Sequence, residues 1–125
     1  MYVHDRVLDA GLAALKAEAT HIYINSAEPA TFTAATSTNA LGSKNFGAGA
    51  VYPGAIAAAT PNGRKVTTAP VTDGSVSANG TASHESVVDS VNSRLLIAGP
   101  LNASQVVTLG NPFTLTAFDF RLPNA

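Results

Sequence analysis

Residues 72–100 read TDGSVSANGTASHESVVDSVNSRLLIAGP. Strand-forming residues gather in two of its segments, 81–89 and 94–98, and only Ser90 to Ser93 separate them. Two such segments joined by a short polar connection are typical of a β-hairpin. We therefore expect an antiparallel pair of strands here, and we read the rest of the chain outward from it.

Turn signals divide the residues on both sides of this hairpin. Asp73-Gly74 and Asn79-Gly80 flank residues 75–78, and both pairs suit tight turns that need a positive φ. Gly99-Pro100 is expected to end the second strand of the hairpin.

The C-terminal residues predict another pair of strands, 105–109 and 113–120, joined by Gly110-Asn111-Pro112. In the last strand the apolar alternation changes phase, and a β-bulge near Ala117 would explain the change.

Asn62-Gly63 precedes a further short strand, 64–68, so residues 63–125 read as an antiparallel β region. Short strands at this spacing predict a sandwich or a barrel, jelly-roll-like in character, and leave open which of the two forms.

Residues 34–41 suit a short turn of helix, whereas the first 19 residues predict a full helix. Its apolar stripe is formed by Leu8, Leu12, Leu15 and Ala19, widened by Val7 and Ala14. Asp5 is the expected N-cap. Residues 20–25 follow with the alternation of a strand.

Residues 26–62 show no lasting period and consist mostly of Ala, Thr, Gly, Ser and Asn. We expect a long irregular segment with two open interpretations: a surface loop, or an arm ordered by a neighbouring subunit. The candidate partner contacts are its larger side chains and the basic pair that follows it: Phe32, Phe46, Val51, Tyr52, Ile56, Arg64 and Lys65.

Composition limits the classes of function. The 125 residues suit a single domain, and the net charge is −1 with 12% charged residues, which argues against nucleic-acid binding. Cysteine is absent, which excludes disulfides and thiolate metal sites. We expect no cofactor, no export signal and no membrane-spanning segment.

Catalytic motifs are missing as well. His84-Glu85 begins like a zinc-protease motif, but Val88 stands where the second histidine belongs, and the segment is predicted strand. Ser86, His84 and Asp89 are neighbours on that strand rather than an assembled triad. We therefore expect a protein that is not an enzyme.

Several segments nevertheless resemble a group of small structural proteins of tailed bacteriophages and prophages. They extend over nearly the whole chain and are Asp5–Asp9, Ile22–Pro29, Leu41–Gly47, Pro61–Val66, Gly80–His84 with Val88-Asp89, Ser93–Leu96 and Gly110–Asp119. The second half also resembles a widespread virion β-domain. Glu85 departs from the pattern, because the position after the histidine is expected to hold a bulky aromatic residue.

The resemblance implies a virion protein, made in the bacterial cytoplasm. Its leading form is a capsid decoration (cement) protein that packs on the major capsid protein and on itself as a homotrimer. A tail or tail-fibre-associated protein is the alternative within the class. A glycan-binding β-sandwich is a further alternative, which the absence of Trp disfavours.

Overall fold

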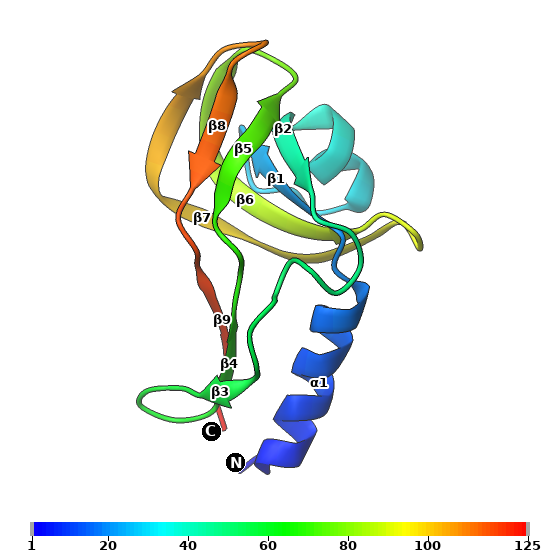
Figure 1. Ribbon diagram of the computed structural model, residues 1–125, viewed down its shortest axis with the longest axis vertical. Coiled ribbons are helices and arrows are strands. Elements are labelled where there is room, and N and C mark those ends of the chain that lie inside the picture. Colours follow the sequence, from blue (N-terminus) through cyan, green and yellow to red (C-terminus); the bar gives the residue numbers. More distant parts are fainter. Residues whose placement is uncertain (1, 125) are drawn as a thin grey trace.

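The computed structural model describes residues 2–124, which form one N-terminal α-helix and two antiparallel sheets (Figure 1). The helix α1 spans Asp5–Glu18, and a short π-helix, η1, spans Ala34–Thr38. The strands are β1 (His21–Asn25), β2 (Ala40–Asn45), β3 (Ala57–Ala58), β4 (Arg64–Thr67), β5 (Val71–Val76), β6 (Gly80–Asp89), β7 (Arg94–Val107), β8 (Pro112–Leu115) and β9 (Asp119–Leu122). The prediction of a mainly β protein with one N-terminal helix is confirmed.

Six strands form a strongly curled sheet in the order β7-β6-β1-β2-β5-β8 (Figure 1). All its neighbouring strands are antiparallel. The curl brings β7 and β8 to face each other, but within the described residues these two end strands are not paired. The architecture is therefore a half-barrel, open along one side.

The smaller sheet, in the order β3-β4-β9, lies below the half-barrel beside α1 (Figure 1). One apolar core connects these parts, because Leu12 and Leu15 of α1, Val66 of β4 and Ile22 of β1 belong to the same cluster. The helix thus lies at one end of an elongated molecule, with most of the curled sheet at the other (Figure 1).

The start of α1 differs in detail from the prediction. His4, not Asp5, is the N-cap: its Nδ1 accepts a hydrogen bond of 3.0 Å from the backbone N–H of Arg6. Asp5 lies in the first turn, where a carboxylate favours the helix dipole. Val7 and Ala14 are exposed and do not widen the buried stripe, because the narrow sheet beside α1 covers only one side of the helix.

The hairpin predicted around residues 90–93 is confirmed between β6 and β7. Asp89 holds its turn, since one carboxylate oxygen accepts from the backbone N–H groups of Val91 and Asn92 at 3.0 and 3.2 Å. The other oxygen accepts from Asn92 Nδ2 at 2.8 Å. These bonds, that of the Asn92 side chain foremost, hold the pKa of Asp89 below its ordinary value.

The prediction that residues 26–62 are irregular is wrong for 40–45. Those residues form β2, an inner strand that pairs with both β1 and β5. Its small side chains have a packing reason: a Cβ on Gly42 would lie 2.6 Å from the carbonyl oxygen of Ser75 in β5. The two backbones approach so closely at Gly42 that a β-branched side chain would not fit there, and β-branched residues are the usual signal of a strand in a sequence.

Asn25 attaches η1 to the sheet. Its side chain is fully buried, and Nδ2 donates to the carbonyl oxygen of Ala35 at 2.8 Å and to that of Asn39 at 3.4 Å. Asn25 Oδ1 accepts from the hydroxyl of Ser86 in β6 at 2.7 Å. A polar contact thus fixes part of the segment that the sequence left unassigned.

Two turn signals have other roles. Gly74 lies inside β5, where a Cβ would come 2.3 Å from the ring of Phe113, so the glycine makes room for that ring rather than for a turn. Gly99-Pro100 lies inside β7, which runs on to Val107. A proline is tolerated there because β7 is an edge strand.

The expected last strand, 113–120, is divided in two. β8 ends at Leu115 and pairs with β5, whereas β9 starts at Asp119 and pairs with β4 in the other sheet. The phase change near Ala117 therefore marks a crossing between sheets, not a β-bulge. The expected pairing of 105–109 with this strand is also wrong, since β7 pairs with β6.

Candidate functional site

The open side of the half-barrel is the candidate site, and we call it the seam: the gap between residues 97–105 of β7 and residues 114–120. A cavity of about 250 Å³ lies between residues 100–105 and 114–118. A second, of about 150 Å³, lies between residues 97–99 and 118–120. Glu85 of β6 and Phe118 line both cavities, so they form the shared wall of the seam.

Glu85 faces the inside of the half-barrel. It lies opposite Ile24 of β1 in register, and paired residues of neighbouring strands share a face of the sheet. Ile24 is fully buried, so this face is the core side. On its other side Glu85 lies opposite Gly99, which has no side chain to cover it.

The environment of Glu85 is unfavourable for its charge. Among residues 2–124, no side chain forms an ion pair with it. Burial raises the pKa of the Glu85 carboxyl to about 7. The seam therefore contains a carboxyl group that exchanges its proton near neutral pH and that a cationic group would hold in the charged form.

A second polar group lies close to this carboxyl. Tyr52 is fully buried, and its hydroxyl has no hydrogen-bond partner among the described residues. Burial raises the pKa of Tyr52, and the negative charge of Glu85 raises it further. Of these two groups only Glu85 lines the cavities of the seam, and the hydroxyl of Tyr52 lies buried in the core.

Residues 83–89 of β6 do not assemble a catalytic group. Ser83 Oγ and His84 Nδ1 are 2.8 Å apart, but His84 lies opposite Asn25, on the other face from Glu85. Asp89 is engaged in the hairpin turn. No group of three or more His, Cys, Asp or Glu side chains within residues 2–124 could hold a metal ion.

Val51 and Tyr52 are not surface contacts, and their prediction as partner contacts is wrong. Both side chains belong to the apolar core and are 0% exposed to solvent. The backbone explains why: the carbonyl oxygen of Val51 accepts from the N–H of Ala69 at 2.8 Å, which draws this segment onto the chain that enters β5. Val51 and Tyr52 therefore fill the core rather than a surface between subunits.

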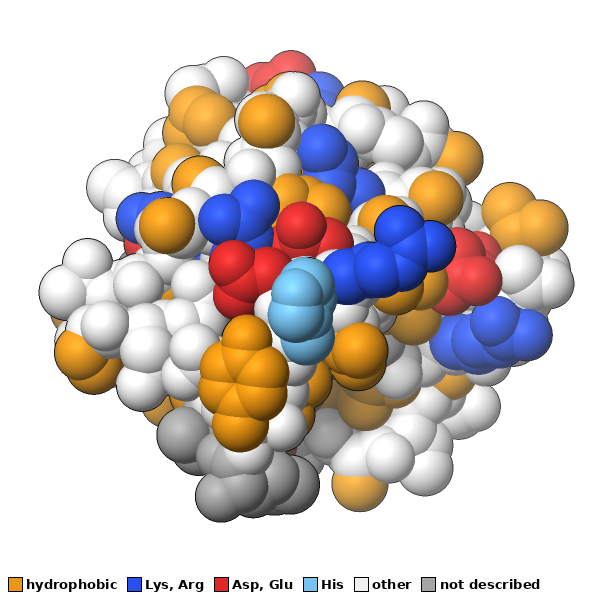
Figure 2. All heavy atoms as spheres, turned by 90° about the horizontal axis from the view of Figure 1, so that it is seen from below, with side chains coloured by type: hydrophobic (Ala, Val, Ile, Leu, Met, Phe, Trp, Pro, Cys, Tyr) orange, Lys and Arg blue, Asp and Glu red, His pale blue; other side chains and the backbone are white. Residues whose placement is uncertain are grey.

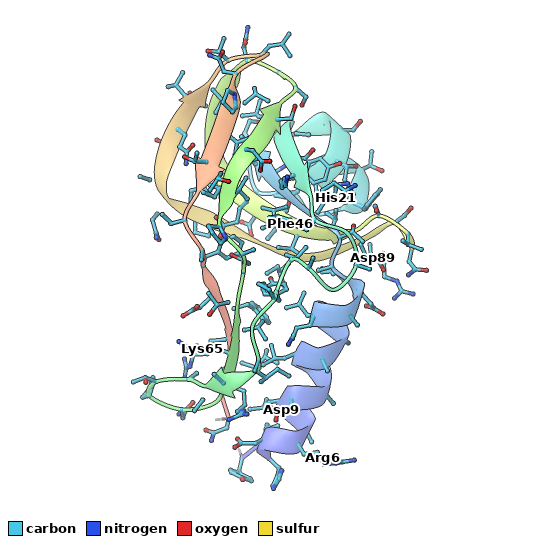
Figure 3. The ribbon with its side chains drawn as sticks, viewed as in Figure 1. Arg6, Asp9, His21, Phe46, Lys65 and Asp89 are labelled. Atoms are coloured by element: carbon cyan, nitrogen blue, oxygen red, sulfur yellow. The ribbon has the colours of Figure 1, made fainter. Side chains whose placement is uncertain are left out.

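Three other predicted contacts are half-buried and lie on different elements. Phe46 follows β2 and packs on the core, with Lys44 Nζ 6.0 Å from its ring centroid (Figure 3). Ile56 also packs on the core and lines shallow hollows beside Ala13 of α1. Phe32 precedes η1. The structure thus does not bring the predicted aromatic and aliphatic anchors into one surface.

Arg64 and Lys65 are engaged within the chain. Arg64 Nε donates to Asp9 Oδ1 of α1 at 2.8 Å, and Lys65 Nζ to Asp119 Oδ2 of β9 at 3.3 Å. The first pair joins β4 to α1 and the second joins β4 to β9; Figure 3 labels Asp9 on the helix and Lys65 on the small sheet. Acidic and basic side chains are interleaved over this end of the molecule (Figure 2), so it carries no strong charge of one sign.

Exposed apolar side chains occur at both ends of the long axis. Tyr2 and Val7, at the α1 end, are 72% and 64% exposed. Val106 and Leu109, at the connection between β7 and β8, are 83% and 61% exposed. Figure 1 shows these two regions at opposite ends. No local pattern distinguishes Val106 from its neighbour Val107, which is equally apolar, yet only Val107 is buried.

Comparison with protein-family models, curated proteins and solved structures finds no match to this chain. No helix within residues 2–124 is long and apolar enough to cross a membrane. The resemblance to phage structural proteins stays a prediction, and function is argued below from geometry together with that resemblance.

Proposed function

We propose that the protein is a structural component of a bacteriophage virion, a capsid decoration protein that binds the major capsid protein and other copies of itself as a homotrimer. It acts by packing and carries out no catalysis. The observation that carries this proposal is the exposure of apolar side chains at opposite ends of an elongated molecule: Tyr2 and Val7 at one, Val106 and Leu109 at the other.

Apolar groups at two separated ends allow one molecule to contact two neighbours at once. Burying apolar surface contributes roughly 25 cal/mol per Å², so each such contact is individually modest. In a shell, however, the same contact is repeated many times, and linked contacts strengthen one another without any one being strong. A decoration protein that stabilises a capsid needs this kind of bivalent attachment.

The test combines light scattering of the isolated protein with co-sedimentation on undecorated capsids of the phage that encodes it. We expect a discrete trimer that sediments with the capsids. A monomer, or an open polymer, that ignores the capsids would contradict the proposal; the polymer would point to the tail.

Surface variants locate the contacts. We expect Val106→Ser with Leu109→Ser, and separately Tyr2→Ser with Val7→Ser, each to reduce capsid binding or trimer formation at least tenfold. The matched control is Val91→Ser, at an equally exposed valine (80%) in the β6–β7 turn, away from both ends. If the control weakens binding as much as the end variants do, the ends are not the contact surfaces.

A further inference from the structure

We propose that the seam binds an extended segment of another polypeptide that places a lysine or arginine side chain against Glu85. This site requires neither a capsid nor a trimer, so it is independent of the function proposed above. Free strand edges, the shape of the cavities and the charge of Glu85 support this site.

The strand edges supply the backbone groups. β7 and β8 are the two ends of the six-stranded sheet, so each has one side that no other strand covers among the described residues. A free edge presents unpaired N–H and C=O groups, to which an extended chain adds as a further strand. The bond between Gln105 and Thr114 bridges the two edges along β8, so the incoming segment adds to the free edge of β7, and residues 114–120 form the opposite wall of the groove.

The cavities supply the side-chain sites. They lie one after the other along β7, with volumes of about 250 and 150 Å³, separated by Phe118 and Glu85. Alternate side chains of an extended segment point to the same side, so successive inward-facing residues enter successive cavities. The seam is closed near the β7–β8 connection, where Gln105 Nε2 donates to the carbonyl oxygen of Thr114 at 3.2 Å. This hydrogen bond limits the segment to the part of the groove below it.

Charge selects the inward-facing residue. Glu85 lines both cavities and has no ion-pair partner from the described part of the chain. Leu101, Leu115 and Phe118 provide apolar walls beside it. The long methylene chain of lysine or arginine packs on such walls while its charged end reaches a carboxylate.

The experiment is an NMR titration of the ¹⁵N-labelled protein at pH 8 with a capped heptapeptide of alternating threonine and valine that has lysine at its centre. We expect amide shifts concentrated in residues 97–105 and 114–120. A second peptide, with norleucine in place of lysine, keeps the methylene chain without the charge. It is expected to bind at least tenfold more weakly.

Two protein variants complete the test. Glu85→Gln keeps the shape of the side chain, and we expect it to weaken binding of the lysine peptide at least tenfold. Glu28→Gln, at an exposed acid outside the seam, is the matched control and should bind like the original chain. An unchanged thermal midpoint or a higher one shows that Glu85→Gln is folded.

The proposal is overturned if the lysine peptide causes no shifts along the seam, if the norleucine peptide binds equally well, or if Glu85→Gln binds like Glu28→Gln. None of these outcomes bears on capsid binding or on trimer formation, which are measured separately.

Discussion

At the scale of single residues, Glu85 places a carboxyl group on the inner face of the half-barrel, opposite Ile24. Its neighbours on the inner face, Ile24 and Val87, are fully buried apolar residues, and the resemblance to phage proteins implies a bulky aromatic residue here. A carboxyl group at an inward position has a cost, which its place at the open seam limits because water reaches it there.

This cost makes stability depend on pH. Since the folded pKa is about 7 and the ordinary value 4.5, the folded state holds the proton between these values while the unfolded state has lost it. The contribution of Glu85 to stability is therefore greatest below pH 4.5, falls as the pH rises from 4.5 through 7, and is level above that. Each pKa unit corresponds to about 1.4 kcal/mol. Allowing for solvent screening of a half-buried group, we expect the free energy of unfolding to fall by about 1–3 kcal/mol between pH 4.5 and pH 7 because of Glu85.

Urea unfolding of the original chain and of Glu85→Gln at pH 5 and pH 8 measures this effect. The variant should be the more stable of the two at pH 8, and the gap should narrow at pH 5. His21, whose pKa is lowered by burial, changes stability in the opposite direction but equally in both proteins, so the comparison cancels it. If the difference in stability between the two proteins is the same at pH 5 and pH 8, Glu85 does not have a raised pKa in the folded state.

Gly74 shows why some local signals misled. Asp73-Gly74 has the composition of a tight turn, but the glycine is needed by the ring of Phe113, a residue far along the chain. At Gly63 and Gly110, by contrast, φ is +88°, and both glycines lie in turns where the sequence predicted them. Residue type alone does not distinguish a glycine kept for its dihedral angles from one kept for space.

At the scale of elements, local patterns predicted the helix and the hairpin but not β2. The leucines of α1 and the polar turn after Asp89 act within a few residues, so their signals are complete in the sequence. β2 is specified by what lies on either side of it, namely β1 and β5. Its own residues include no β-branched or aromatic side chain, and the same composition suits a loop.

The contact between Asn25 and η1 gives a prediction at this scale. Asn25→Ala leaves the hydroxyl of Ser86 and the carbonyl oxygen of Ala35 without their partner in a buried site. We expect a loss of about 1–3 kcal/mol in the free energy of unfolding. Hydrogen exchange should become faster in residues 34–38.

The matched control for this change is Asn102→Ala, at an exposed position of β7. It should leave both the stability and the exchange of η1 nearly unchanged. If Asn25→Ala destabilises the chain without faster exchange in residues 34–38, the asparagine supports the sheet and does not hold η1.

At the scale of the whole molecule, the attachment of α1 depends on its apolar side. Leu12 is fully buried, and a helix of this length is marginal without tertiary contacts. We expect Leu12→Ala to cost about 2–5 kcal/mol and to lower the helix signal in circular dichroism. Asp9→Asn, which removes the partly exposed pair with Arg64, should cost far less. Similar losses for the two variants would contradict this, because the ion pair would then contribute as much to the attachment of α1 as Leu12 does.

The seam is a property of the whole molecule as well, which is why sequence analysis did not find it. Its walls come from three separate parts of the chain: Glu85 of β6, residues 97–105 and residues 114–120. The sequence drew attention to Glu85, but only the strand order places that residue beside an open edge.

The position of β1 at the middle of the large sheet has a consequence for the time that folding takes. One of its two partners, β6, follows at a great distance along the chain, with His21 opposite Val88. During synthesis β1 therefore waits for residues of the second half before its far side is covered. Closing so long a loop costs entropy before any contact repays it, and sheets built from such distant pairs fold slowly, in roughly milliseconds to seconds. During that interval β1 and α1 have little to bury against, and the nascent chain is at its most vulnerable to wrong partners.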